Sequence, residues 1–302
     1  MSIATRWWRV ASSEPRETVE AEARRGAVRC ALCFRACLIP AGNTGYCRVR
    51  RYDGESLISP YMGRFCSAAV DPIEKKPLHH WRPGSFIYSL GSLGCNMRCP
   101  FCQNHRIAQP DFRQQERLPG TTPITPQELV RNVRSSRLDS VAYTYNEPTL
   151  QAEYILEAAP LLQEAGIATV LVTNGMFSRD ALRDLAPWVA AANIDVKTFN
   201  AGTYAAMGGS LPTVMDTVTL LAEAGAHLEL TSLIVPGLTD SPEEFAGMVD
   251  WIASLSPDIP LHISRYFPAH GYREPSTPIS LLQTFASMAQ ARLHHVHIGN
   301  VK

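Results

Sequence analysis

The sequence has no excess of charge of either sign. Its 302 residues carry 28 basic and 28 acidic side chains, a formal net charge of +0 at pH 7. Proteins that hold nucleic acid through its phosphates use a broad positive field, which releases the counterions around the polyanion. A balanced chain does not supply that field, so we expect no nucleic acid partner. A local basic patch is still compatible with the balance.

Long apolar runs are absent as well. No stretch approaches the roughly 20 uncharged apolar residues that a membrane helix needs. Residues 1–15 have no continuous apolar run followed by small residues, which a signal peptide would show. We therefore expect a cytoplasmic protein with no membrane association. With 45% hydrophobic residues, the chain can bury one large core, or a core and a small additional module.

From about residue 86 onward, short apolar runs alternate with longer helical patterns. The runs cover residues 86–90, 140–145, 168–173, 193–197, 227–235, 261–266 and 295–298. This alternation is typical of an α/β fold around a parallel sheet, and seven runs favour a barrel or a partial barrel. Thr125 with Glu128, and Ser241 with Glu244, have the capping-box pattern of a helix start, each with a proline at the first helical position.

Residues before 86 lack this periodicity. Glycine, proline, arginine and cysteine dominate there, so something other than a large core must hold the segment. We expect two parts: a cysteine-rich metal-binding arm with its connector over residues 1–84, and the barrel over residues 85–302. The arm is either an extended segment lying on the barrel or a small module held by metal.

Three of the 8 cysteines follow the first predicted strand with the spacing C-x3-C-x2-C: Cys95, Cys99 and Cys102. Clustered cysteines in a reducing compartment usually bind metal or do redox work. Three thiolates this close can hold three irons of a cubic [4Fe–4S] cluster and leave the fourth iron open. The alternative is a closed zinc site, for which His105 is a candidate fourth ligand.

With the aromatic Phe101 before the last cysteine, the triplet resembles the motif of the radical S-adenosylmethionine (radical SAM) superfamily. The resemblance implies an α/β partial (β/α)6 TIM-type barrel, here with an N-terminal cysteine-rich extension. It implies that S-adenosylmethionine chelates the open iron, and that an electron from the reduced cluster splits this cofactor into methionine and a 5′-deoxyadenosyl radical. That radical would abstract hydrogen from a substrate. Reduced flavodoxin or ferredoxin would supply the electron.

Functional residues of such barrels lie where the strands end and the following loops begin. Residues 143–149 resemble the glycine-glycine-glutamate-proline motif that binds the cofactor's amino group, with Tyr145 and Asn146 in place of the two glycines. The resemblance assigns Phe101, Asn146 and Glu147 to cofactor binding.

The later strand ends supply further candidates for cofactor binding. Asn174 ends the third run, and Asp195-x-Lys197 looks like an element of the glycyl-radical-activating enzymes that could pair with the cofactor's ammonium and carboxylate. Leu233 begins a segment similar to the one that brackets adenine. We expect His262 and Arg265 to point to the same rim. The alternative for each polar residue is an ordinary strand-end group or ion pair, and for His262 a packed core histidine.

The remaining cysteines gather near the N-terminus. Cys30, Cys33, Cys37 and Cys47 give four thiolates in eighteen residues, which can enclose either zinc or a second iron–sulfur cluster. We favour a closed structural site; the alternative is an auxiliary cluster that relays electrons or holds substrate. Cys66 stands alone, as a small buried hydrophobic residue would.

Residues 30–300 resemble one subgroup, the AmmeMemoRadiSam-system radical enzymes, which are related to pyruvate formate-lyase activating enzyme. The resemblance rests on the four-cysteine arm through residue 50, the connector 71–80, the triplet continuing into Gln103 and Asn104, and residues 143–149. It implies two companion proteins of the same system. The connector's charged and histidine side chains could line a substrate entrance, or the connector is a proline-braced linker packed on the barrel.

Two other functions remain open from the residues alone. One is a glycyl-radical activase that acts on a protein backbone, which the Asp195-x-Lys197 element favours. The other is a non-catalytic scaffold in which the metal sites are structural or sense oxygen. The sequence assigns neither a substrate nor the residues that act on it.

Overall fold

The computed structural model describes residues 3–4, 6–10 and 26–301. Residues 1–2, 5 and 11–25 lie outside the described residues. They include part of the expected N-terminal arm and part of the segment 1–15, which we expect not to be a signal peptide. None of the helices within the described ranges is long and apolar enough to cross a membrane.

An eight-stranded sheet forms the centre of the molecule. Its order is β16-β15-β14-β13-β12-β11-β9-β8, and all neighbours are parallel except β8, which is antiparallel to β9. β8 and β16 are its two edges, so the sheet is open. Its strands are β8 (Ser67–Pro72), β9 (Phe86–Gly91), β11 (Ser140–Tyr143), β12 (Ala168–Thr173), β13 (Val189–Asp195), β14 (His227–Ile234), β15 (Leu261–Arg265) and β16 (Val296–Gly299).

The seven parallel strands are those that the apolar runs predict, with one shift. β13 begins four residues before the run expected at 193–197, because its first residues, VAAA, are small and apolar and extend the strand toward its amino end. The strands β11 and β12 are buried almost throughout, as expected of a parallel sheet covered on both faces.

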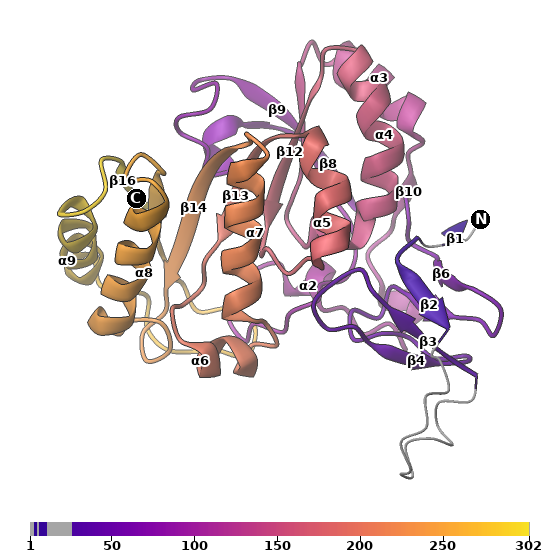
Figure 1. Cartoon of the computed structure of the whole chain (residues 1–302), viewed down its shortest axis with the longest axis horizontal. Coiled ribbons are helices and arrows are strands. Elements are labelled where there is room, and N and C mark those ends of the chain that lie inside the picture. Colours follow the sequence, from indigo (N-terminus) through magenta and orange to yellow (C-terminus); the bar gives the residue numbers. More distant parts are fainter. Residues whose placement is uncertain (1–2, 5, 11–25, 302) are drawn as a thin grey trace, which may run out of the picture.

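Helices connect the successive parallel strands and cover the outer face of the sheet, where Figure 1 shows several of them side by side. The connecting helices are α3 (Pro126–Ser135), α4 (Ala152–Glu164), α5 (Arg179–Leu185), α7 (Leu211–Glu223), α8 (Pro242–Leu255) and α9 (Ile279–Gln290). Shorter helices are α2 (His105–Ala108), α6 (Ala201–Ala206), η1 (Ile73–Lys75), η2 (Gln115–Arg117), η3 (Pro148–Gln151) and η4 (Ala186–Trp188).

The two expected capping boxes differ in outcome. At α3 the box is complete, since Thr125 Oγ1 accepts the Glu128 N–H and the Glu128 carboxylate accepts the Thr125 N–H. At α8 only Ser241 caps the helix. The Glu244 carboxylate instead accepts hydrogen bonds from the side chains of Thr198 and Asn200 at 3.2 and 2.7 Å, which ties α8 to the loop after β13.

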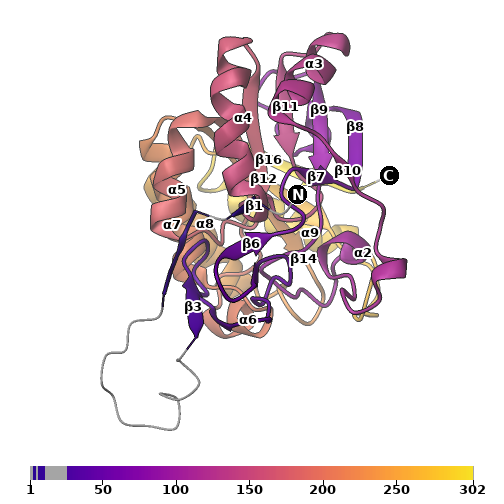
Figure 2. The same cartoon turned by 90° about the vertical axis from the view of Figure 1, so that its right-hand side faces the viewer.

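The N-terminal strands and β10 form smaller sheets, with orders β2-β3-β4, β1-β6-β5 and β10-β7. They are β1 (Ile3–Ala4), β2 (Trp8–Val10), β3 (Ala27–Cys30), β4 (Leu38–Pro40), β5 (Arg51–Tyr52), β6 (Leu57–Ser59), β7 (Arg64–Phe65) and β10 (Thr122–Pro123). Figure 1 shows β2, β3 and β4 at the lower right, and Figure 2, in which that side faces the viewer, shows β3 at the lower left and β6 near the middle. A buried ion pair of 2.8 Å between Arg50 and Glu153 of α4 joins the N-terminal arm to the helices that cover the central sheet. The Ser178 N–H adds a hydrogen bond of 3.0 Å to the Leu32 carbonyl.

The connector after β8 packs into the concave face of the sheet. Ile73 and Leu78 are fully buried there against small strand residues, among them Ala142 and Ala191. Because β8 belongs to the central sheet, residues 67–72 before position 84 are physically part of that sheet. The division of the chain at 84 stays a prediction.

A carboxylate near the amino end of β14 fixes the connector. Glu229 is fully buried and accepts the backbone N–H groups of His79 and His80 at 2.9 and 2.7 Å, and the rings of His227 and His262 at 3.0 and 2.7 Å. Burial alone would raise the pKa of Glu229, but these hydrogen bonds outweigh it and hold the pKa well below the usual range.

A further histidine belongs to the layer formed by Glu229 and its histidine partners, and it makes the stability of the fold sensitive to acid. His297 stacks on His262 at 5.1 Å between ring centroids, and burial together with neighbouring histidines lowers its pKa to about 4. The unfolded chain, with a histidine pKa of about 6.5, binds that proton more readily. Stability is therefore full above about pH 6.5 and falls as the pH drops toward 4.

We predict that His297→Gln flattens this dependence. Between pH 7 and 5, the free energy of unfolding of the native protein should fall more than that of the variant by on the order of 1 kcal/mol, a modest value because the ring is partly solvent-exposed. Urea unfolding at several pH values measures it. His294→Gln is the matched control, since His294 is exposed and pairs with Asp258 outside this layer. Parallel pH curves for the native protein and His297→Gln would contradict the assignment.

Candidate functional site

A cavity of about 350 Å³ lies at the carboxyl ends of the parallel strands. It takes in the three triplet cysteines and residues from the ends of β11 to β15. Of the site residues expected from the sequence, those that line it are Cys95, Cys99, Phe101, Cys102, Asn146, Glu147, Asn174, Asp195, Lys197 and Leu233. The connector contributes Lys75, Lys76 and Pro77.

The cysteine loop, residues 94–102, starts at a glycine, and any other residue there would displace neighbouring atoms. Gly94 has φ +89°, and a Cβ there would lie 2.7 Å from Val49 Cγ1 and 3.1 Å from the Cys47 carbonyl oxygen. The triplet loop is therefore packed directly against the four-cysteine arm. This contact joins the two cysteine groups, which are far apart in the sequence.

The chemistry of the donor set fits an iron–sulfur cluster. Burial raises the pKa of Cys99 to about 11, while the Lys197 ammonium acts in the opposite sense and favours the thiolate that a metal requires. A cubic cluster spreads its three cysteine ligands over three irons, so they need not converge on one point. In the described part of the chain, no three His, Cys, Asp or Glu side chains are placed to hold a single metal ion.

His105 does not complete the triplet as a zinc ligand. Its ring stacks on His270 at 4.6 Å with 16° between the planes, its Nδ1 lies 3.1 Å from the Cys102 carbonyl oxygen, and it does not line the cavity. The closed zinc site therefore lacks its candidate fourth ligand in this arrangement, and three cysteines with an open position fit better.

Glu147 is a buried carboxylate that joins the ends of β11 and β12. Oε1 accepts the Thr149 N–H at 3.0 Å and the hydroxyls of Thr149 and Thr173 at 2.5 and 2.7 Å, and Oε2 accepts the Asn174 N–H at 2.9 Å. Burial raises the pKa of Glu147, while these donors favour the charged form. Oε2 has one donor only and can still accept an ammonium group.

Asn174 extends this hydrogen-bonded connection to the cysteine loop. Its Nδ2 donates to Asn96 Oδ1 at 2.9 Å and lies 3.6 Å from Cys95 Sγ, and its Oδ1 accepts the Met176 N–H at 3.0 Å. Asn96, which is fully buried, was not among the expected site residues. An asparagine between two cysteines has no sequence pattern that identifies it, since its partner lies 78 residues away.

Asn146 holds the loop from the other side. Its Oδ1 accepts the Ser92 N–H at 2.9 Å, and its Nδ2 donates to the Gly94 carbonyl and to Ser92 Oγ, each at 2.9 Å. Both ends of the Asn146 side-chain amide are therefore hydrogen-bonded to Ser92 or Gly94. Asn146 lines the cavity, and these bonds position the cysteine loop.

Asp195 and Lys197 form an ion pair of 2.9 Å within the cavity. Burial alone would lower the pKa of Lys197, but Asp195 and the nearby Cys99 outweigh it and raise the pKa, so the ammonium stays charged. The positive charge of Lys197 therefore lies close to Cys99.

Phe101 is buried and packs its edge against Tyr266 with ring centroids 6.5 Å apart.

The expectation that His262 and Arg265 point to this rim is wrong. His262 shares a face of the sheet with Ser264, which does line the cavity, but it lies two residues closer to the amino end and binds Glu229 there. Arg265 has the opposite parity in β15, and its Nε donates to the Thr277 carbonyl at 2.8 Å. Relative to Ser264, Arg265 is one residue further on and therefore lies on the opposite face of the sheet, whereas His262 is two residues earlier and lies on the same face, nearer the amino end of the strand.

At the cavity, the connector contacts Tyr145, one of the two residues that stand where the resembled motif has glycines. Lys76 is buried and pairs with Asp71 at 2.7 Å, and the Tyr145 hydroxyl also donates to Asp71. Tyr145 has φ +68°, a left-handed conformation that costs a non-glycine residue about 1–3 kcal/mol. Asn104 supports it by donating to the Tyr145 carbonyl at 2.7 Å.

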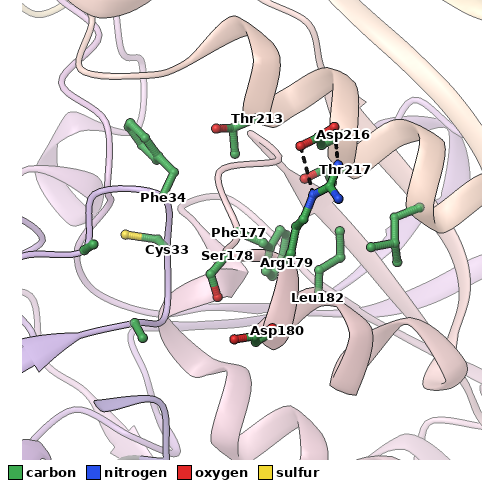
Figure 3. A pocket seen from close by; sticks show the side chains of 13 residues that line it. Cys33, Phe34, Phe177, Ser178, Arg179, Asp180, Leu182, Thr213, Asp216 and Thr217 are labelled. Atoms are coloured by element: carbon green, nitrogen blue, oxygen red, sulfur yellow. Dashed lines mark hydrogen bonds and ion pairs between the residues drawn. The ribbon is translucent and has the colours of Figure 1, made fainter. Parts of the chain in front are cut away.

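The four N-terminal cysteines lie in one turn-rich segment, where the Cys30 N–H donates to the Cys37 carbonyl at 2.9 Å. Burial raises the pKa of Cys33 to about 12, with contributions from the charges of Cys47, Cys30 and Cys37. Between this segment and helices α5 and α7 lies a second cavity of about 340 Å³. Figure 3 shows Cys33 and Phe34 on one side of it and the Arg179–Asp216 ion pair on the other.

Comparison with known proteins gives the superfamily to which the chain is similar. The family model described as the radical SAM superfamily matches residues 90–252. The uncharacterized protein MJ0808 of Methanocaldococcus jannaschii is 36% identical over 283 residues, which is 91% of this chain and 81% of that protein.

More distant relatives have named activities. The 7-carboxy-7-deazaguanine synthase of Thermococcus kodakarensis is 26% identical over 60% of this chain and 78% of its own length, and the pyruvate formate-lyase-activating enzyme of Streptococcus mutans is 25% identical over 54% and 64%. Among solved structures, Streptococcus suis SuiB bound to S-adenosylmethionine superposes with a TM-score of 0.54 at 15% identity. It covers 76% of this chain, which spans about half (54%) of SuiB.

The chain belongs to the radical SAM superfamily. Its cofactors are a [4Fe–4S] cluster and S-adenosylmethionine, and an enzyme of this superfamily needs a reduced electron donor.

We predict that Glu147→Gln destabilises both the fold and the site. The amide replaces two acceptor oxygens with one acceptor and one NH2 group, which opposes the surrounding donors and costs about 2–3 kcal/mol. Urea unfolding and the dissociation constant for S-adenosylmethionine measure the two effects. Thr149→Val, which removes one of the four hydrogen bonds, is the control and should cost about 1 kcal/mol. Equal losses in the two variants would contradict a central role for the carboxylate.

Proposed function

We propose that this chain is a radical-generating enzyme of the AmmeMemoRadiSam subgroup, with Cys95, Cys99 and Cys102 as the ligands of its [4Fe–4S] cluster. The observation that carries the proposal is one cavity in which three cysteines and a charged Asp195–Lys197 pair meet, with His105 turned away. When bound, the cluster and S-adenosylmethionine supply an electron-driven cleavage that yields methionine and a 5′-deoxyadenosyl radical for hydrogen abstraction.

The chain's own residues bind and orient the cofactor. Glu147 Oε2 accepts the cofactor's ammonium, because it is the carboxylate oxygen with the fewest donors. Lys197 pairs with the carboxylate, and Leu233 packs against the adenine. Asn146 and Asn174 act on the cysteine loop, which they hold to the ends of β9 and β12. Phe101 lines the cavity and packs against Tyr266.

The test is anaerobic reconstitution followed by reduction with dithionite in the presence of S-adenosylmethionine. We predict 5′-deoxyadenosine and methionine as products, and we predict that Cys99→Ala loses both the cluster and the cleavage. Cys66→Ala is the matched control and should retain both, because Cys66 lies outside the two cysteine groups, with its thiol toward the Gly91 carbonyl at 3.4 Å. An intact cluster that yields neither product would refute the proposal.

We propose further that Cys30, Cys33, Cys37 and Cys47 hold a second metal in a closed site, either zinc or an auxiliary cluster. Four soft ligands in one short segment, of which Cys30 and Cys47 are buried, support this, and metal binding would draw the thiols together as it deprotonates them.

Metal analysis separates the two identities. We predict about four irons per chain from the triplet, plus either one zinc or about four more irons from the arm. Cys37→Ala should remove only the second component and leave the triplet's iron. Protein with one cluster's worth of iron and no zinc would contradict the second site.

A second candidate function is glycyl-radical activation of a partner protein. The Asp195-x-Lys197 element and the 25% identity to a pyruvate formate-lyase-activating enzyme favour it. A glycyl radical detected by paramagnetic resonance on a companion protein would support it, and its absence with active enzyme would favour a small-molecule or other substrate.

A further inference from the structure

Positive charge is segregated within this neutral chain. Residues 27–52, which contain the four-cysteine segment, carry five arginines and no acidic residue, and residues 91–109, which contain the triplet, carry Arg98 and Arg106 and no acidic residue. The whole chain nevertheless balances 28 basic against 28 acidic side chains. The acidic residues that offset these arginines therefore lie elsewhere in the sequence.

Part of this charge gathers around one exposed aromatic ring. The guanidinium carbons of Arg35 and Arg98 lie 3.5 and 4.7 Å from the centroid of Tyr46, whose side chain is 37% exposed. Arg48, two residues further along, is exposed. We call Arg35, Tyr46, Arg48 and Arg98 the arginine face.

The arginine face lacks carboxylate partners within the described ranges. Arg35 and Arg98 donate to backbone carbonyls, and no ion pair involves either of them or Arg48. Arg50 differs, since it is buried and paired with Glu153. Among the described residues, the charge of the face therefore has no carboxylate counterion, which favours an acidic partner.

The same guanidinium groups hold the backbone of the cluster loop. Arg98 Nη1 donates to the carbonyls of Cys95 and Met97 at 2.8 and 2.9 Å, and Arg35 Nε donates to the Asn96 carbonyl at 2.9 Å. Arg98 Nη2 donates to the Tyr46 carbonyl at 2.7 Å. A protein seated on this face would therefore lie within one hydrogen-bonded side chain of the loop that carries the metal ligands.

We propose that the arginine face is the docking surface for a small acidic one-electron carrier protein that reduces the cluster. The inference rests on the proposed function. In the step, the reduced carrier loses one electron, the oxidised [4Fe–4S] cluster gains it, and no bond forms or breaks. Complementary charge steers such an encounter and makes it sensitive to salt. Nucleic acid fits less well, because it needs a longer positive track than three arginines provide.

The experiment uses the reconstituted full chain with flavodoxin as the probe, and it compares Arg48→Glu with Arg137→Glu. Arg137 is a matched control: it is exposed, has φ +57° against +64° for Arg48, and precedes β11, at the end of the sheet away from the cluster. The first readout is the dissociation constant for oxidised flavodoxin, followed by flavin fluorescence at increasing ionic strength. The second is the rate of cluster reduction by flavodoxin hydroquinone, with dithionite as a bypass.

We expect Arg48→Glu to weaken flavodoxin binding about tenfold at low salt, to flatten the salt dependence, and to slow reduction by flavodoxin to a similar extent. Arg48→Gln should fall between the native protein and Arg48→Glu. Arg137→Glu should match the native protein, and dithionite should drive cleavage equally in all four. Retained iron and dithionite activity show that the variants fold.

Flavodoxin binding within twofold of native in Arg48→Glu would overturn the docking surface. The same holds if Arg48→Glu weakens the binding of transfer RNA and leaves flavodoxin binding unchanged. Failure of dithionite to support cleavage in the native protein would instead overturn the proposed function, so the two failures are distinguishable.

Discussion

The buried carboxylate of Glu147 is the interaction on which the site depends. Its four hydrogen bonds join the ends of β11 and β12, and through Asn174 they reach Asn96 and Cys95 in the cluster loop. A carboxylate taken out of water is stable only when its oxygens are satisfied, so the strand ends are fixed relative to one another by electrostatics as well as by the sheet. The cysteines thereby acquire a defined place at the cavity.

An open sheet leaves a concave face that must be filled, and the connector fills it. Ile73 and Leu78 supply apolar volume, while Glu229 near the amino end of β14 and Asp71 near the cavity hold the connector by polar contacts at two levels. The amino ends of the strands thus serve stability and the carboxyl ends serve chemistry. The same connector supplies Lys76 to the wall of the cavity.

The four-cysteine arm contacts the loop that carries the cysteine triplet. Gly94 packs against Cys47, and Arg35 and Arg98 bridge the arm and the cluster loop around Tyr46. A displacement of the arm would therefore move the backbone that carries the triplet. This arrangement gives the arm a structural role at the cysteine loop.

The sequence by itself determined the seven parallel strands, the helix starts at Thr125 and Ser241, and the spacing of the triplet, because periodicity, caps and ligand spacing depend on near neighbours along the chain. Only the tertiary structure decided that His262 serves Glu229 and not the cavity, that Glu244 leaves its capping box, and that Asn96 meets Asn174. These choices depend on strand register and on segments as far apart as His79 and Glu229, 150 residues, which local pattern does not encode.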